Sequence, residues 1–378
     1  MKGIGADVVI VGGGVIGCAL ARELAGRGAG VTVVEKGEPG EEASFAAAGL
    51  LAPQAENLAP GPLLDLALES RGLYPGWTAD LTQETGIDVG YRRCGILRCA
   101  LPGDPRPGER EPFDEFAWQL SAGLPVERCG AGEIVSRSGG AASPEITEGL
   151  FFPEEGIVNN RLLTAALHVS ARRRGVTFLT QTAALRVVSR GGRCAGVETG
   201  RGVIAAEKVV NAAGAWAGFD AGTAVPIEPV RGQIVEIESP GRLPTVLESR
   251  DVYIVPRGET LLLGSTAERV GFEKTVTAGA VERLIGSAAR LVPSLAKAAF
   301  LGAWAGLRPA SPDGLPILGP GPVSGLFLAT GHFRNGILLA PVTSLVMADL
   351  ISGDAARDLA AFSVFRFGAP ARVSGGRA

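Results

Sequence analysis

The chain has 378 residues, enough to bury more than one hydrophobic core, so we expect two domains. Its net charge is −3 with a pI of about 5.7, which argues against a nucleic-acid or anionic-membrane partner. No run of 18 apolar residues occurs, so no segment is expected to span a membrane. Five scattered cysteines and two histidines lack metal-binding spacing, and we interpret the cysteines as reduced thiols in a cytoplasmic protein.

The first 35 residues contain the motif on which the rest of the interpretation depends. An apolar run at 6–11 ends in three glycines, a helical pattern follows, and a β-branched run at 31–34 closes on Glu35. Strand, glycine turn, helix, strand and acid in this order form the βαβ fingerprint of an adenine dinucleotide site. The fingerprint alone does not separate FAD from NAD.

Each residue of the fingerprint has a physical role. Gly12 allows the tight turn, Gly14 lets the backbone approach a pyrophosphate, and Gly17 lets the helix pack against the strand. The start of the helix offers unpaired N–H groups and a positive dipole end to the phosphates. Glu35 is placed to accept hydrogen bonds from a ribose diol.

The next part of the chain predicts a mixture of helices and short strands. Small residues at 43–51 allow close backbone approach to a flat ligand, although an alanine-rich core helix is the alternative. An amphipathic helix is expected at 63–81, a short strand pair at 90–100 and an exposed loop at 102–112.

From about residue 149 the alternation of helices and strands resumes. We expect helices at 160–174, 278–291 and 336–351. Strands are expected at 176–179, 185–189, 194–199, 203–206, 208–211, 233–238, 251–257, 261–265 and 326–329. The last 25 or so residues look weakly ordered.

A second strand–turn–helix near the C-terminus, at 326–351, favours FAD over NAD. A dinucleotide domain assembled from both ends of the chain, with antiparallel strands between them, suits the larger, extended cofactor. The second helix would begin at about Asn335 and Gly336. If its positive end faces the N1/O2 edge of a flavin, it stabilises the anionic reduced ring.

Two arginines are the candidates for substrate binding. Arg308 and Arg334 lie in apolar, glycine-rich surroundings, where a permanently charged guanidinium needs an anionic partner. A substrate carboxylate fits the guanidinium fork, and Tyr253 is a further candidate; an internal ion pair is the alternative for either arginine. We assign no acid–base work to His168 or His332, because hydride loss from an amine requires no protein base.

At these residues the chain resembles the FAD-dependent amine oxidoreductases of the D-amino-acid oxidase type and, among them, the glycine-oxidising members of the thiamine pathway. The stretches that carry the resemblance are 8–17 with Glu35, 44–55, 253–257, 304–309 with 313–314, and 331–341. They span nearly the whole chain in the family's order. The resemblance implies an α/β fold in which a discontinuous FAD-binding Rossmann-like domain joins a substrate domain with an antiparallel sheet.

The resemblance also implies roles for individual residues. Arg308 would bind the substrate carboxylate with help from Tyr253, and Arg334 would lie beside the substrate and the flavin. Leu50 would lie over the flavin near the substrate, and Ala184 would contact the adenine half through its backbone.

The cofactor contacts that these arguments predict come from both ends of the chain. They are Gly12, Gly14, Val15, Ile16, Gly17, Glu35, Lys36, Ala43, Ser44, Ala48, Gly49, Leu50, Ala184, His332, Phe333, Arg334, Asn335, Gly336, Ile337 and Leu338. No cysteine follows Cys194 and no histidine precedes His168, so the FAD should be non-covalent. The family tends to have a histidine where this chain has Asp251, which leaves any proton-handling role of that position open.

We divide the chain as the resemblance suggests. Residues 1–85, 145–220 and 303–365 form the FAD-binding domain, residues 86–144 and 221–302 the substrate domain, and residues 366–378 a tail. The family precedent favours a homo-oligomer, a tetramer.

The expected activity is the oxidation of glycine, and of sarcosine or small D-amino acids, to the imine, with O2 reduced to H2O2. The imine would hydrolyse to glyoxylate or supply the thiazole of thiamine. The first alternative is a dehydrogenase of the same fold that acts on D-amino acids or secondary amines and reduces a quinone. A flavin subunit of a larger complex and an NAD-dependent dehydrogenase are the others.

Overall fold

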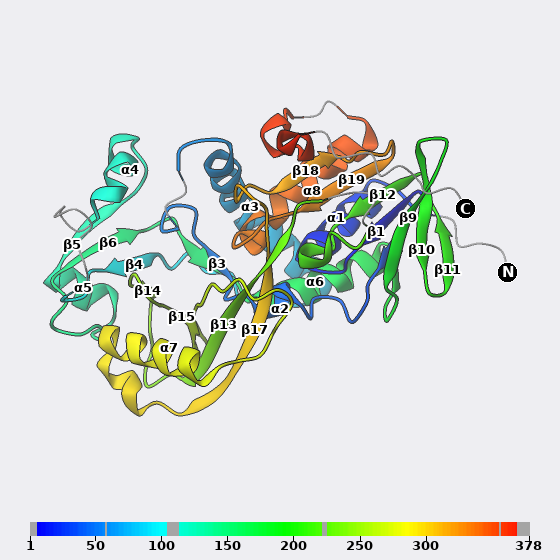
Figure 1. Ribbon diagram of the computed structural model, residues 1–378. Helices are drawn as coiled ribbons and strands as arrows, with labels where there is room; N and C mark the ends of the chain where they lie inside the picture. The colour runs from blue at the N-terminus through cyan, green and yellow to red at the C-terminus, as the bar shows by residue number, and fades with distance from the viewer. Residues whose placement is uncertain (1–5, 57–58, 104–112, 221–224, 355–356, 369–378) are drawn as a thin grey trace.

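The computed structural model describes residues 6–56, 59–103, 113–220, 225–354 and 357–368, and two sheets dominate it (Figure 1). The fingerprint folds as predicted, into β1 (Val8–Val11), α1 (Val15–Gly26) and β2 (Val31–Val34). Strand β1 pairs in parallel with β2, and all four residues of each strand are buried. Apolar side chains on both faces of these strands are typical of a parallel sheet that is covered on both sides.

The first sheet has six strands in the order β18-β19-β12-β1-β2-β8. The four strands beyond the fingerprint are β8 (Thr177–Leu179), β12 (Lys208–Asn211), β18 (Ile317–Pro320) and β19 (Leu326–Thr330). All neighbours are parallel except β18 and β19. Strands from both ends of the chain meet here, which confirms the prediction of one domain built from separate segments.

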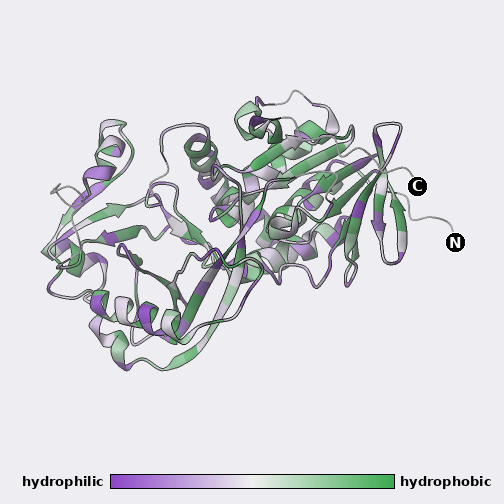
Figure 2. Ribbon diagram, in the orientation of Figure 1, coloured by the Kyte–Doolittle hydropathy of each residue, from purple (hydrophilic) through white to green (hydrophobic). Residues whose placement is uncertain are grey.

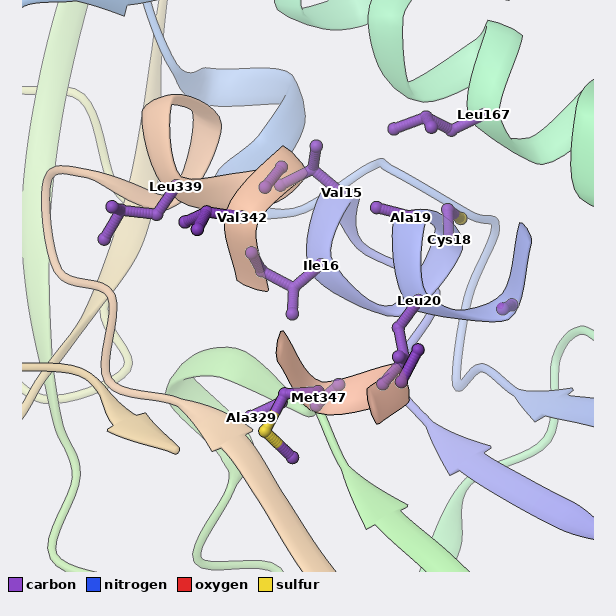
Figure 3. Packing of buried hydrophobic residues seen from close by; sticks show 14 of the residues in the cluster. Val15, Ile16, Cys18, Ala19, Leu20, Leu167, Ala329, Leu339, Val342 and Met347 are labelled. Carbon is purple, nitrogen blue, oxygen red and sulfur yellow. The ribbon is translucent and has the colours of Figure 1, made fainter. Parts of the chain in front are cut away.

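Three long helices pack together with α1 beside this sheet. They are α3 (Pro62–Thr85), α6 (Asn160–Arg173) and α8 (Gly336–Ser352). Figure 3 shows Ile16 and Leu20 of α1 facing Val342 and Met347 of α8, all of them buried. Helix α8 is apolar around most of its circumference, as expected for a helix enclosed by other elements.

The second sheet has eight strands in the order β17-β13-β16-β15-β14-β4-β6-β5. Its strands are β4 (Ile96–Cys99), β5 (Glu127–Gly130), β6 (Glu148–Phe152), β13 (Glu228–Glu238), β14 (Val246–Glu248), β15 (Tyr253–Arg257), β16 (Thr260–Gly264) and β17 (Phe300–Ala310). Only the pair β4 and β14 is parallel. This mainly antiparallel sheet, beside a mainly parallel one, confirms the predicted fold class.

The two longest strands, β13 and β17, extend from the eight-stranded sheet toward the six-stranded one (Figure 1). Helix α7 (Ala278–Leu291) covers one face of the eight-stranded sheet with Leu284 and Ala288. Apolar residues concentrate on the strands of both sheets, while α7 carries hydrophilic residues among its apolar ones (Figure 2).

The smaller elements complete the fold. They are α2 (Ala43–Ala46), β3 (Leu50–Leu51), α4 (Ala117–Ser121), α5 (Ala131–Arg137), β7 (Gly156–Ile157), β9 (Ala184–Arg190), β10 (Arg193–Thr199), β11 (Gly202–Ala205) and five short 3-10 helices at 114–116, 214–216, 293–297, 360–362 and 364–367. Strands β9 to β11 form a separate antiparallel sheet. No described helix is long and apolar enough to cross a membrane.

Three local predictions need correction. Residues 90–100 form one strand, β4, because its partners β14 and β6 come from distant parts of the chain. Residues 43–51 form a four-residue helix and a two-residue strand, so the alternative of a core helix is wrong. Residues 357–368, in the stretch expected to be weakly ordered, form two short 3-10 helices with Phe362 and Val364 buried. Most of the predicted loop at 102–112 lies outside the described residues.

The proposed domain division follows the two sheets except at two boundaries. Strand β6 and most of β17 belong to the eight-stranded sheet, although residues 145–152 and 303–310 were assigned to the FAD-binding domain. At the other end, Arg366 of the proposed tail is held by Asp313 at 2.7 Å. The division remains a proposal.

Candidate functional site

A cavity of about 330 Å³ connects the fingerprint with the eight-stranded sheet. Gly12, Glu35 and Ala184 line it on the side of the first sheet, and Tyr253 and Arg308 line it on the side of the second. Every predicted site residue contributes to its wall except Gly17 and Leu338. The fold therefore brings together residues from both ends and from the middle of the chain.

The glycine turn has the geometry that the fingerprint requires. Gly12 has a φ of +107°, and a Cβ there would lie 2.4 Å from the carbonyl oxygen of Ala212. A Cβ on Gly17 would lie 1.9 Å from the carbonyl oxygen of Gly12. Gly17 therefore permits close packing of α1 on the turn, which explains why it is absent from the cavity wall.

The Glu35 carboxylate is fixed by backbone donors. Its Oε2 accepts a hydrogen bond from the Gly13 N–H at 2.7 Å, and its Oε1 accepts one from the Gly37 N–H at 2.9 Å. A carboxylate has about four acceptor sites, so two such bonds leave capacity for ribose hydroxyls. The side chain is buried and lines the cavity, as a ribose-binding acid must.

The neighbouring walls add polar and aromatic groups. The Ser44 hydroxyl accepts a hydrogen bond from the Val15 N–H at 2.9 Å, at the start of α1. The Lys36 ammonium lies 3.1 Å from the centroid of the Trp216 ring and 2.9 Å from the Glu42 carboxylate. Trp216, which follows the predicted strand at 208–211, also lines the cavity and was not among the predicted site residues.

The start of α8 faces the same cavity. Its first intrahelical hydrogen bond runs from the Leu339 N–H to the Asn335 carbonyl, so the N–H groups of residues 336–338 have no partner within the helix. Gly336 and Ile337 line the cavity, whereas Leu338 is buried in the core behind it. A side-chain contact from Leu338 to the cofactor is therefore not supported, and only its N–H is suitably placed.

The turn before α8 is held by neighbouring elements. Phe333 has a φ of +46°, which is uncommon outside glycine, and its N–H donates to the Pro309 carbonyl at 2.9 Å. His332 lies 3.2 Å from the Thr343 hydroxyl, and burial lowers the pKa of this histidine to about 3. His332 is therefore neutral at physiological pH, in agreement with giving it no acid–base role.

Arg308 lines the cavity and has no carboxylate partner among the described residues. Its Nη1 donates to the Thr266 carbonyl at 2.9 Å, its Nη2 donates to the Ser265 hydroxyl at 2.7 Å, and Tyr253 is also in hydrogen-bonding contact. Burial lowers the pKa of Arg308, yet a guanidinium keeps its charge in proteins. Among the described residues no carboxylate pairs with it, so the alternative of an internal ion pair does not apply to Arg308.

Arg334 behaves differently. Its Nε lies 3.0 Å from Oε2 of Glu56, and its Nη2 lies 3.1 Å from Oε1 of the same residue. The internal ion pair, our alternative for either arginine, therefore holds for Arg334. Both side chains line the cavity, so Arg334 still lies near Tyr253 and Arg308. Asp251 is exposed and lies outside the cavity wall.

Two glycines that sequence reasoning missed make room for Arg308 and Tyr253. A Cβ on Gly232 of β13 would lie 2.2 Å from Nη1 of Arg308, and a Cβ on Gly264 of β16 would lie 2.4 Å from the Tyr253 hydroxyl oxygen. The effect of Gly232 depends on the pairing of β13 with the distant strand β17, and that of Gly264 on the register between the neighbouring strands β15 and β16, so nothing in the local sequence identified either glycine.

The family model that describes the FAD-dependent oxidoreductases matches residues 7–350. The chain belongs to this family. The predicted preference for FAD over NAD is thereby confirmed, as is the predicted family.

Individual relatives resemble the chain along nearly its whole length. A glycine oxidase from Geobacillus kaustophilus is 39% identical over 368 residues, covering 95% of this chain and 97% of the relative. The crystal structure of glycine oxidase from the same species superimposes with a TM-score of 0.90 at 38% identity, covering 96% of this chain and 99% of that one. A bifunctional ThiO/ThiG protein from a Nostoc species is 39% identical over 355 residues, which cover 91% of this chain and 52% of the relative. The chain therefore spans about half of that third protein.

The residues in the cavity fit the FAD of this oxidoreductase family. The positive φ of Gly12 and its close contact with Ala212 exclude a side chain at this position and keep the turn before α1 tight, as the fingerprint requires. The starts of α1 and α8 both face the cavity and offer positive dipole ends to anionic parts of the cofactor. Glu35 and Arg308 both line this cavity.

Proposed function

We propose that this chain oxidises glycine, and with it sarcosine or small D-amino acids, with FAD as cofactor and O2 as electron acceptor. The observation that carries the proposal is the partly buried guanidinium of Arg308 in the wall of the FAD cavity, which has no carboxylate partner among the described residues. A substrate carboxylate is the partner whose planar geometry matches that fork. The two glycine oxidase matches support glycine as the substrate.

In this proposal, Arg308 and Tyr253 bind the carboxylate and fix the direction of the α-carbon. Ser265 and the Thr266 carbonyl keep the guanidinium in place. Leu50 lies in the apolar part of the same wall and excludes water from the reacting centre. When bound, FAD would supply the acceptor for the hydride of the α-carbon and the electrons that convert O2 to H2O2.

The protein's part in the chemistry is to position the amine. The reacting amine must be unprotonated, and His332, buried and neutral, remains without an acid–base role. The contact between the substrate carboxylate and Arg308 holds the α-carbon in one orientation for reaction. Orientation of this kind accounts for a large share of rate enhancement when no proton transfer by a side chain is needed.

We propose that the cofactor is held non-covalently by the residues predicted from the sequence. The Gly12 turn with Gly14, Val15 and Ile16 would receive the pyrophosphate, and Glu35 the ribose. The remaining contacts would be Lys36, Ala43, Ser44, Ala48, Gly49, Leu50, Ala184, His332, Phe333, Arg334, Asn335, Gly336 and Ile337, and the backbone N–H of Leu338.

The imine that leaves this site would hydrolyse to glyoxylate and ammonia or enter thiazole formation for thiamine. The similarity to a bifunctional ThiO/ThiG protein supports the second fate. We further propose a homo-oligomer, a tetramer by family precedent, in the cytoplasm. All five cysteines are free thiols, which is consistent with a reducing compartment.

The decisive experiment is an anaerobic reduction of the purified, FAD-loaded chain. Glycine should bleach the flavin absorbance, and air should restore it with release of H2O2. A flavin that glycine reduces but that only a quinone reoxidises would replace the oxidase by the dehydrogenase alternative. A flavin that ignores glycine, sarcosine and small D-amino acids would overturn the proposal.

A further inference from the structure

The Glu56–Arg334 ion pair lies between two cavities. Both residues line the FAD cavity, and both also line a second cavity of about 200 Å³. We call the part of the first cavity around Tyr253 and Arg308 the inner chamber, and the second cavity the outer chamber. The rest of the outer wall is mostly charged and comprises Ala55, Arg98, Glu115, Phe116, Glu248 and Arg250.

The pair is bidentate and anchored from the side of Arg334. The two N–O distances of 3.0 and 3.1 Å describe a guanidinium fork on both carboxylate oxygens. Arg334 belongs to the turn before α8, which is fixed to β17 through the hydrogen bond from the Phe333 N–H to the Pro309 carbonyl. This arginine is therefore aimed at the boundary between the chambers by the fold itself.

The residues that lead to Glu56 belong to a buried polar network, and the Glu56 N–H itself donates to the Ala52 carbonyl at 3.1 Å. The Glu155 carboxylate accepts hydrogen bonds from the Gln54 N–H at 2.7 Å and from Nη1 of Arg71 at 3.2 Å. Arg71 also donates to Oε1 of Gln54 at 2.7 Å, and Gln119 donates to the Gln54 carbonyl at 2.9 Å. Three members of this network are fully buried: Gln54, Gln119 and Glu155. The backbone just before Glu56 is therefore held in place.

The charges around the inner chamber sum to one uncompensated cation. Arg308 has no carboxylate partner among the described residues, while Glu56 neutralises Arg334. One substrate carboxylate bound to Arg308 would neutralise this remaining positive charge. A second carboxylate, on the nitrogen or the α-carbon, would meet Glu56 instead of a free guanidinium, and like charges in a partly desolvated site repel strongly. Arg98 of the outer chamber cannot substitute, because it is paired with Glu248 at 2.7 Å.

We propose that Glu56 selects the charge of the substrate: by neutralising Arg334 it restricts the site to amines with one carboxylate and excludes amino dicarboxylates. The inference rests on the proposed function in one respect, namely that Arg308 receives the substrate carboxylate. It predicts that removal of the Glu56 charge frees Arg334 to bind a second carboxylate, so that one substitution changes specificity without a change of shape.

The test compares diglycolate with its monoamide, two non-amine ligands of the same shape that differ by one charge. Their Kd values are read from the perturbation of the flavin absorbance of the holoenzyme, without turnover. In the wild type the monoamide should bind at least about tenfold more tightly, the scale of one charge-assisted contact. Glu56→Gln should shift this ratio at least about tenfold toward diglycolate.

Two further variants identify the cause. Glu127→Gln removes an equal charge from β5, where Glu127 forms an exposed pair with Arg137 of α5. This variant should leave the ratio at its wild-type value. The double variant Glu56→Gln/Arg334→Gln should lose the gain, because the freed cation is gone. A gain that persists in the double variant would overturn the proposal.

The wild-type ratio alone is decisive if Glu56→Gln fails to fold or to retain FAD. Equal or tighter binding of diglycolate by the wild type would refute charge selection, as would the absence of binding by both ligands. These readouts do not depend on whether glycine reduces the flavin. Failure of glycine oxidation and failure of charge selection are therefore observed separately.

Discussion

Gly232 and Arg308 are diagonal neighbours on the paired strands β13 and β17, where Gly232 pairs with Gly306 and Arg308 with Val230, and a Cβ on the glycine would lie 2.2 Å from Nη1 of the arginine. The guanidinium occupies the space that a side chain would take. Strand β13 therefore determines where the proposed carboxylate-binding group lies, although it contributes no charge to the cavity at this position.

Gly232→Ala should displace the guanidinium and weaken substrate binding. Because Arg308 is also held by Ser265 and Thr266, its displacement should disturb those contacts as well. We expect KM for glycine to rise by at least about tenfold, because small misplacements of a positioning group are costly. Steady-state kinetics at saturating O2 measure this. An unchanged KM would show that the guanidinium of Arg308 can move without weakening substrate binding.

Arg308→Ala should lower kcat/KM for glycine by at least about a hundredfold, with the loss expressed mainly in KM. Truncation of one partner of a buried charge pair costs several kcal/mol. Arg308→Lys keeps the charge but loses the fork, and should recover only part of the loss. If Arg308→Ala retained wild-type kinetics while Arg334→Ala did not, Arg334 rather than Arg308 would be the residue that binds the substrate carboxylate.

Glu35→Gln should weaken FAD binding by about tenfold or more. The carboxylate accepts hydrogen bonds from the Gly13 and Gly37 N–H groups, and an amide would turn one of these contacts into a donor–donor pair. Titration of the apoprotein with FAD, followed by flavin fluorescence, measures the affinity. Glu41→Gln, at an exposed position nearby, is the control and should bind FAD as the wild type does.

The sequence predicted those parts of the site whose residues lie close together in the chain and form a recognisable local motif. Gly12, Gly17 and Glu35 lie within one βαβ unit, where local geometry dictates residue type. Arg308 and Arg334 were candidates because a permanent charge in apolar, glycine-rich surroundings needs an anionic partner, and the family resemblance then suggested a role for each of them and for Tyr253.

Long-range pairings account for what the sequence missed. Glu56 lies 278 positions before Arg334, and no local pattern distinguishes it from a surface glutamate. The role of Gly232 depends on the register between β13 and β17, and the single strand β4 depends on partners from β6 and β14. Such pairings are fixed by tertiary packing, which local propensity does not report.

Glu155→Gln should change how the stability of the protein depends on pH. Burial raises the pKa of the Glu155 carboxyl from its ordinary value of 4.5 to about 8. The native state then holds a proton that the unfolded chain releases, so this residue's stabilising contribution is fully present below pH 4.5 and is lost as pH rises toward about 8.

Thermal unfolding of the FAD-loaded protein between pH 5 and pH 8.5 measures the effect. The wild type should lose stability as pH rises through this window, and Glu155→Gln should lose less of it, because its amide does not titrate. Glu154→Gln, at the neighbouring exposed pair with Arg93, should keep the wild-type slope. A Glu155→Gln protein whose slope matches that of the wild type would mean that Arg71 holds Glu155 ionised throughout, and that the buried network around Gln54 is an ion pair at every pH tested.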